Sequence, residues 1–236
     1  MFIEGAMNKV LRQEHKFQLS YIEYRKLCAR LQLYLKADPH CGADGYRVRS
    51  LYFDTMNNCD FHEKADGLEK RRKLRLRIYS PHDDFAMFEM KQKQGIYQLK
   101  RSLCVTKADA VLLSQGNYAP LLSSGDAFAR ECYAFMNERV YRPKAIVEYR
   151  RFAFVEKCND IRITFDHSLM ATESSTDLFN HNLSMYPVCS QSVVTLEVKY
   201  RDFLLQYIKD AVNVCNKTDV SLSKYALARS ATLGLI

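Results

Sequence analysis

The chain has 236 residues, of which 47% are hydrophobic and 26% are charged. A chain of this size buries about 70% of its extended surface on folding, so we expect one globular domain over residues 1–236. No segment contains the roughly 20 consecutive apolar residues of a transmembrane helix, and the N-terminus lacks a signal-peptide core. These features exclude a membrane-spanning or secreted class, and we expect a cytoplasmic protein.

The charge balance indicates an anionic partner. Lysine and arginine number 35 against 27 acidic residues, which gives a net charge of +8. Such an excess favours nucleic acid, polyphosphate, nucleotide or an anionic membrane surface, without choosing among them. The eight cysteines are widely spaced, and no C-x-x-C pair is present. We therefore expect free thiols in a reducing compartment.

Eight segments are predicted to be strands, several of them because polar and apolar residues alternate along them. The alternation is clearest around residues 71–79, where Arg71, Lys73, Arg75 and Arg77 fall on one face and Leu74, Leu76 and Ile78 on the other. The predicted strands cover residues 12–19, 47–54, 71–79, 87–93, 97–105, 145–155, 160–166 and 195–200.

Five helices are predicted between the strands, which indicates an α+β fold. Ser20 with Glu23 forms a capping box at the start of the first helix, and Thr106 with Asp109 opens the second, which Gly116 ends. The other three are expected over about residues 126–141, ended by Pro143, over 202–214 and over 223–233.

The row formed by Arg71, Lys73, Arg75 and Arg77 carries four like charges at spacings of about 7 Å, so it repels itself unless an anion neutralises it. A solvated face is the ordinary explanation of such a strand, but charged faces recur on several other strands. If the strands close into a barrel with apolar faces under helices, the charged faces line its lumen. We expect a basic tunnel whose arginines and lysines bind phosphate and whose carboxylates hold a divalent metal.

Eight short motifs resemble, in order, those of the VTC (vacuolar transporter chaperone) domain, which belongs to the CYTH-like triphosphate tunnel metalloenzymes. They are EHKF at 14–17, YFD at 52–54, KLRLR at 73–77, EMKQK at 89–93, YRRFAF at 149–154, RITFD at 162–166, LEVKY at 196–200 and SKY at 223–225. The resemblance covers about residues 12–230. It implies an eight-stranded antiparallel β-barrel tunnel with flanking helices.

The resemblance implies a polyphosphate polymerase that transfers the γ-phosphoryl group of ATP to inorganic polyphosphate or pyrophosphate, with Mn²⁺ or Mg²⁺ as cofactor. Glu197 would be the main metal ligand, with Glu14 and Glu89 as further carboxylates. The substrate would also contact Lys93, Tyr149, Arg162 and Ser223. The catalytic cations would be Lys16, Arg75, Arg77, Lys91, Arg151, Lys199 and Lys224.

Three positions depart from the related patterns. Arg12 replaces the first carboxylate of the Glu-x-Glu-x-Lys motif of the wider superfamily, which argues against a two-metal triphosphatase or adenylate cyclase. Lys93 stands in place of a histidine of the eukaryotic polymerases, and Ser221 in place of a lysine. Without their phosphate-sensing domain and membrane spans, the chain resembles a stand-alone bacterial form, and a membrane-protein partner for product export stays open.

Two other functions remain. One is a metal-dependent triphosphatase acting on tripolyphosphate or nucleoside triphosphate, and the other is a non-catalytic polyphosphate-binding module, which would not require Glu197. The basic stretch at residues 68–73 also fits a nucleic-acid patch, but no stacking aromatic residues interleave with it. We therefore expect no nucleic-acid partner. His15, beside Phe17 on an apolar face, is predicted to be a histidine of the barrel wall.

Overall fold

The computed structural model describes residues 13–95 and 97–234, so Arg12 lies outside the described residues. The strands form one antiparallel sheet in the order β11-β1-β10-β8-β7-β3-β4-β5-β6, to which β2 and β9 add short pairings. The eight predicted strands are β1 (Gln13–Ser20), β3 (Tyr46–Thr55), β4 (Lys70–Ile78), β5 (Phe85–Gln94), β6 (Tyr97–Thr106), β7 (Tyr141–Glu156), β8 (Ile161–Thr172) and β10 (Val193–Tyr200). Two-residue strands are β2 (Lys36–Ala37), β9 (Tyr186–Pro187) and β11 (Thr218–Asp219).

The predicted helices are α1 (Tyr21–Leu31), α3 (Lys107–Ser114), α5 (Ala127–Glu138), α6 (Gln206–Asn213) and α7 (Lys224–Thr232). The Ser20 side chain accepts from the Glu23 N–H, and Thr106 accepts from the Asp109 N–H, so both predicted caps are confirmed. The sequence pattern missed α2 (Cys59–Ala65) and α4 (Ala119–Ser123), which are too short to show a helical period.

The third predicted helix ends earlier than expected. It stops at Glu138, and Val140 has the left-handed φ of 52°, which turns the chain out of the helix. Tyr141 then starts β7, so Pro143 lies near the beginning of a strand rather than beyond a helix. It opposes Phe53 where the register between β3 and β7 shifts, and such bulges are places where a sheet tolerates proline.

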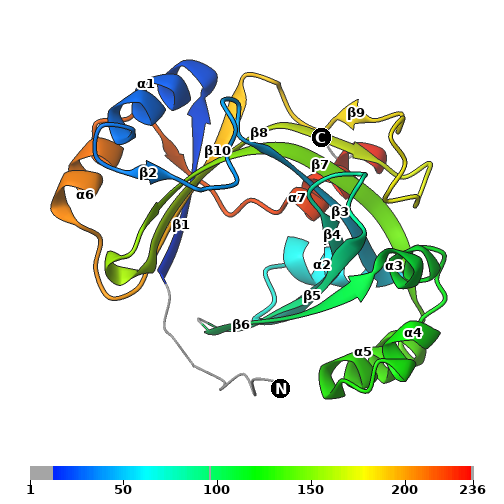
Figure 1. Cartoon of the computed structure of the whole chain (residues 1–236). Helices are drawn as coiled ribbons and strands as arrows, with labels where there is room; N and C mark the ends of the chain where they lie inside the picture. The colour runs from blue at the N-terminus through cyan, green and yellow to red at the C-terminus, as the bar shows by residue number, and fades with distance from the viewer. Residues whose placement is uncertain (1–12, 96, 235–236) are drawn as a thin grey trace.

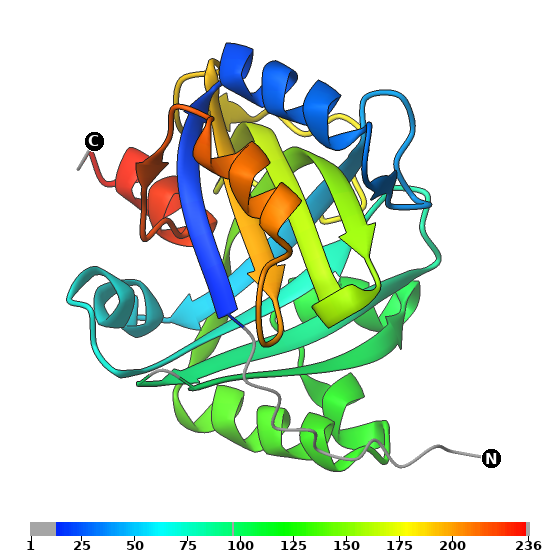
Figure 2. The ribbon, with the colours of Figure 1, turned by 90° about the vertical axis from the view of Figure 1, so that its left-hand side faces the viewer.

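The sheet bends into an arch whose convex face is covered by helices (Figure 1). On one side α1 and α6 pack over β1, β10 and β8, where Leu31 and Ile208 meet Phe165 and Leu196 in one buried cluster. On the other side α3, α4 and α5 cover β3, β4 and β5 in a second cluster. Helices α2 and α7 lie at one end of the arch (Figure 2), and Tyr225 of α7 belongs to a third cluster on β3 and β7. The helices therefore leave much of the concave face of the sheet to its polar side chains.

The arch is an incompletely closed barrel. Its two long edge strands are β1 and β6, and within residues 13–95 and 97–234 no backbone pairing joins them. Figure 2 shows β1 crossing β5 and β6 rather than running alongside them. An ion pair spans the gap instead, with Lys91 Nζ on β5 lying 3.4 Å from Glu14 Oε2 on β1. The fold class predicted from the sequence, α+β with eight long antiparallel strands and flanking helices, is confirmed.

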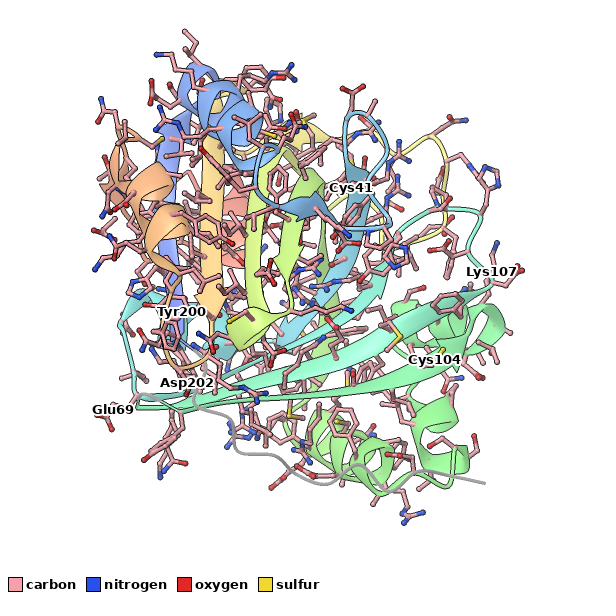
Figure 3. The ribbon with its side chains drawn as sticks, turned by 60° about the vertical axis from the view of Figure 1, so that its left-hand side comes forward. Cys41, Glu69, Cys104, Lys107, Tyr200 and Asp202 are labelled. Atoms are coloured by element: carbon pink, nitrogen blue, oxygen red, sulfur yellow. The ribbon has the colours of Figure 1, made fainter. Side chains whose placement is uncertain are left out.

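All eight cysteines are free thiols, as predicted. Cys41, in the loop after β2, and Cys104, on β6, are labelled in Figure 3. Over the described residues, no helix is both long enough and apolar enough to cross a membrane.

Gly45 allows the chain to enter β3 against the strand that carries Arg151. Its φ is +76°, and an added Cβ would lie 2.2 Å from the carbonyl oxygen of Arg151. Gly67 provides a matched comparison, because its φ is +72° but an added Cβ meets nothing within 4 Å.

We predict that Gly45→Ala lowers the free energy of unfolding by about 3 kcal/mol, because about 1–2 kcal/mol of left-handed strain adds to about 1–3 kcal/mol of overpacking. Gly67→Ala should lower the free energy of unfolding only by the part due to left-handed strain. Urea unfolding of both variants measures the difference. Equal losses would mean that the backbone of β7 moves aside at little cost.

Candidate functional site

The concave face of the sheet carries the charged side chains. Directly opposed residues of antiparallel strands share a face, and the pairs include Lys16 with Glu197 and Arg151 with Asp166. Figure 3 shows side chains filling the space enclosed by the strands. The cations on this face and at the start of α7 are Lys16, Arg71, Lys73, Arg75, Arg77, Lys91, Lys93, Lys100, Arg151, Arg162, Lys199 and Lys224. The carboxylates among them are Glu14, Asp38, Glu89, Asp166 and Glu197.

Glu197 lies among three lysines. It lies 2.7 Å from Lys199 Nζ, 3.6 Å from Lys16 Nζ and 3.9 Å from Lys224 Nζ. Burial by itself would raise the pKa of Glu197, but the three ammonium groups outweigh burial and hold the pKa well below its ordinary value. Glu197 is therefore an anion embedded in lysines.

Glu14 lies beside Glu197 and shares Lys16 with it. Lys16 Nζ is 3.0 Å from Glu14 Oε1, and Lys91 approaches the other oxygen. Burial opposes ionisation, but Lys199, Lys91 and Lys16 together lower the pKa of Glu14 to about 2. Two ionised carboxylates on adjacent strands fit a hard divalent cation such as Mg²⁺ or Mn²⁺, which takes its remaining ligands from phosphate and water.

Glu89 does not join this pair. It lies 2.7 Å from Arg75 Nε, 3.5 Å from Arg77 Nη2 and 2.5 Å from Lys100 Nζ. In the part of the chain that the structure describes, no three histidine, cysteine or acidic side chains gather closely enough to hold a metal. The three-carboxylate set expected from the sequence is therefore not assembled here, and Glu89 holds the two arginines in place instead.

Arg151, Asp166 and Lys224 form a second charged group. Arg151 donates from Nε and Nη2 to the two oxygens of Asp166, each at 2.7 Å, and Lys224 Nζ lies 2.6 Å from the same carboxylate. Both cations lie over the ring of Tyr149, at 5.4 and 4.7 Å from its centroid. Asp166 ends the RITFD motif at 162–166, but no role was expected for it from the sequence.

The other predicted residues also lie on the tunnel side of the sheet. Arg162 donates to Asp38 at 2.5 Å and to the Tyr46 hydroxyl at 3.1 Å. Asp38 lies beyond a two-residue strand, and no sequence motif pointed to it. Lys100, opposite Lys91 on β6, was also missed, although its register with β5 could have revealed it. His15 stacks on Tyr200 on the opposite face, consistent with a wall histidine.

Helix α7 is fixed by a buried network that places Lys224. The Tyr225 hydroxyl donates to Asp54 at 2.7 Å, and Asp54 also accepts from the N–H groups of Asp60 and Phe61 in α2. Asp60 in turn accepts from the Tyr141 hydroxyl at 2.8 Å. Burial, and then the neighbouring Asp54 carboxylate, raise the pKa of Asp60 to about 8.

We predict that Asp60→Asn is more stable than the parent above pH 8. The pKa of Asp60 is raised above its ordinary value of 3.8, so the unfolded chain loses this proton first and stability falls as pH rises from about 4 to 8. A difference of one pH unit between the folded and unfolded pKa corresponds to about 1.4 kcal/mol, so the stabilisation should reach several kcal/mol. Urea unfolding from pH 4 to 9 measures it, and a constant difference between the two proteins would contradict the assignment.

Comparison with known proteins supports this description. The sequence model of the VTC domain matches residues 11–233. No curated protein matches the chain in sequence. Among solved structures, a candidate adenylate cyclase of Bacillus halodurans is 13% identical, with a TM-score of 0.51, 90% of this chain and 95% of that chain covered. The resemblance predicted from the eight motifs is confirmed.

A second solved structure has the same degree of similarity. It is the candidate adenylyl cyclase HpAC1 from Hippeastrum, for which a dominant triphosphatase activity is described. It is 13% identical, with a TM-score of 0.51, and the match covers 92% of this chain and 95% of that one. At this identity both structures establish the fold alone.

Proposed function

Because this chain belongs to the VTC-domain family, we propose that it is an ATP-dependent polyphosphate polymerase. In this proposal the γ-phosphoryl group of ATP passes to the end of an inorganic polyphosphate chain, or to pyrophosphate, on the concave face. The observation that carries the proposal is the excess of cations over carboxylates on that face, with both kinds of group held in place by cross-strand ion pairs. Neutralisation and positioning of phosphate charge supply most of the acceleration in phosphoryl transfer.

The ion pairs made by the carboxylates favour transfer of the phosphoryl group to another phosphate over its transfer to water. Each of the five carboxylates named above, Glu14, Asp38, Glu89, Asp166 and Glu197, has a cationic partner within 4 Å. None is therefore free to remove a proton from water. A terminal phosphate needs no such base, because its second pKa is about 6 and its oxygens are already ionised at neutral pH.

The roles of the predicted residues follow from their contacts. Arg75 and Arg77 keep N–H donors beyond those directed at Glu89, and an arginine fork suits phosphate oxygens. Lys16, Lys91, Lys199 and Lys224 would neutralise the chain as point charges, with Arg151, Arg162 and Lys93 beside them. Tyr149 and Ser223 would add hydrogen bonds.

Glu197 and Glu14 would hold Mn²⁺ or Mg²⁺, which when bound neutralises phosphate oxygens. The lysines now beside both carboxylates would then turn to phosphate. A single domain over residues 1–236, a cytoplasmic location and an exporting membrane partner stay predictions.

A metal-dependent triphosphatase is the second candidate. It is favoured by the pair Glu14 and Glu197, which is chemically suited to a metal, and by the triphosphatase activity described for the Hippeastrum protein. Incubation with ATP and Mn²⁺, followed by gel separation of the products and a phosphate assay, distinguishes the two. A polyphosphate ladder with ADP supports the polymerase, and orthophosphate without a ladder contradicts it.

We predict that Glu197→Gln abolishes turnover but still binds tripolyphosphate without metal, because the variant loses a metal ligand and keeps the surrounding lysines. Glu138→Gln, at the exposed end of α5, serves as the matched control. Turnover and calorimetric binding are measured on both. Full activity in Glu197→Gln would remove this residue from the metal site.

We predict that Arg75→Ala weakens tripolyphosphate binding by about 1.5–3 kcal/mol, the usual contribution of a hydrogen bond to a charged group. Folding should survive, since Glu89 retains Arg77 and Lys100. Arg72→Ala is the control, because Arg72 lies on the opposite face of β4 over the ring of Phe135. Calorimetric titration gives both affinities, and equal losses would place the anion outside the concave face.

A further inference from the structure

Lys73 differs from Arg75, Arg77 and Lys91 on the concave face, because no ion pair joins it to a carboxylate in the described residues. Its Nζ donates to the Ser223 hydroxyl at 2.7 Å. Arg75 and Arg77, on the same face of β4, both lie within 4 Å of Glu89. Lys91, directly opposite Lys73 on β5, is paired with Glu14. Lys73 is thus a cation that the protein itself does not neutralise.

Two more lysines gather near Lys73. Lys64 of α2 donates to the Ser221 hydroxyl at 3.2 Å. Lys93 follows Lys91 by two residues on β5, so both lie on the same face of the sheet. Neither Lys93 nor Lys64 has a carboxylate partner in the part of the chain described. We call Lys64, Lys73 and Lys93 the lysine corner. Helix α7 begins here with Ser223 as its N-cap, and the positive end of its dipole adds to the field.

The surroundings of Lys73 disfavour its charge. Burial and neighbouring positive charges together lower the pKa of Lys73 to about 7, and burial is the larger cause. The neighbouring cations are Lys16 of β1, Lys91 of β5, Lys64 of α2 and Arg75 of β4. Glu14, the carboxylate beside two of these lysines, is paired with Lys16 and Lys91. A buried cation without a counter-ion is costly, and an incoming anion relieves the cost.

We propose that the lysine corner is a phosphate subsite for the polyphosphate chain, and that a phosphate bound there draws a proton from solvent onto Lys73. This inference deepens the proposed function and rests on it, since it takes polyphosphate as the ligand. The neutral amine gains one proton from the buffer and becomes an ammonium group, which donates hydrogen bonds to phosphate oxygens. No covalent bond forms or breaks between protein and phosphate.

Proton uptake can be measured without turnover. Medium-chain linear inorganic polyphosphate is titrated calorimetrically into the full chain with EDTA and no nucleotide, at pH 8, in two buffers of different ionisation enthalpy. With a pKa of about 7, Lys73 is mostly neutral at pH 8, so the parent should take up close to one proton at this residue. Above pH 8 its affinity should then fall by about tenfold per pH unit.

Lys73→Arg keeps a charge that cannot titrate, so it should bind as tightly as the parent or more tightly at pH 8 and take up close to one proton fewer. Lys73→Met should lose the same uptake and bind about tenfold to a hundredfold more weakly. Lys26→Arg, on the exposed surface of α1, is the control and should match the parent in both quantities.

The proposal is overturned if Lys73→Arg takes up as much proton as the parent, or if Lys73→Met binds polyphosphate as tightly as the parent. Should Lys73→Arg fail to fold, Lys73→Met supplies both readouts. If only the polymerase proposal fails, the results differ from these. Polyphosphate would still bind with proton uptake that depends on Lys73, while the protein incubated with ATP and Mn²⁺ would form no polymer.

Discussion

The cross-strand pairing of buried charges on the concave face is the interaction on which this structure depends. Lys16 opposes Glu197, Arg75 opposes Glu89 and Arg151 opposes Asp166, each on neighbouring strands in register. Cations enclosed by strands repel one another, and a carboxylate placed opposite removes most of that repulsion. A shift of one residue in register would turn each charged side chain into the apolar clusters on the other face.

The two faces of the sheet therefore constrain each other. Leu74, Leu76 and Phe88 are fully buried beneath α3 and α5, and their burial fixes which side chains of β4 and β5 point inward. On the concave side, α7 lies at one end of the arch and presents Ser223 and Lys224 to the charged face. Its anchor is the buried contact of Tyr225 with Asp54, so the position of the candidate phosphate ligand Lys224 depends on the hydrogen bond of the next residue in the chain.

Local pattern predicted much of this architecture. The strict alternation in β4 and β5 identified both faces, and the capping residues Ser20 and Thr106 marked two helix starts. The contacts of Asp38 with Arg162 and of Lys64 with Ser221 could not be predicted, because they join segments more than a hundred residues apart without a periodic signal. Nor could the sequence show that Glu89 pairs with arginines while Glu14 and Glu197 share Lys16. That division is decided by strand order and curvature.

The same division of charge links fold to function. Where carboxylates offset part of the positive charge, the concave face is suited to a metal-bound triphosphate, and where lysines have no carboxylate partner it is suited to a free polyanion. The central claim is that phosphate binds on this face. A crystal structure of the protein with tripolyphosphate tests it most directly. We expect phosphate oxygens within hydrogen-bond distance of Arg75, Arg151 and Lys224, and tripolyphosphate bound only on the convex, helix-covered surface would contradict the claim.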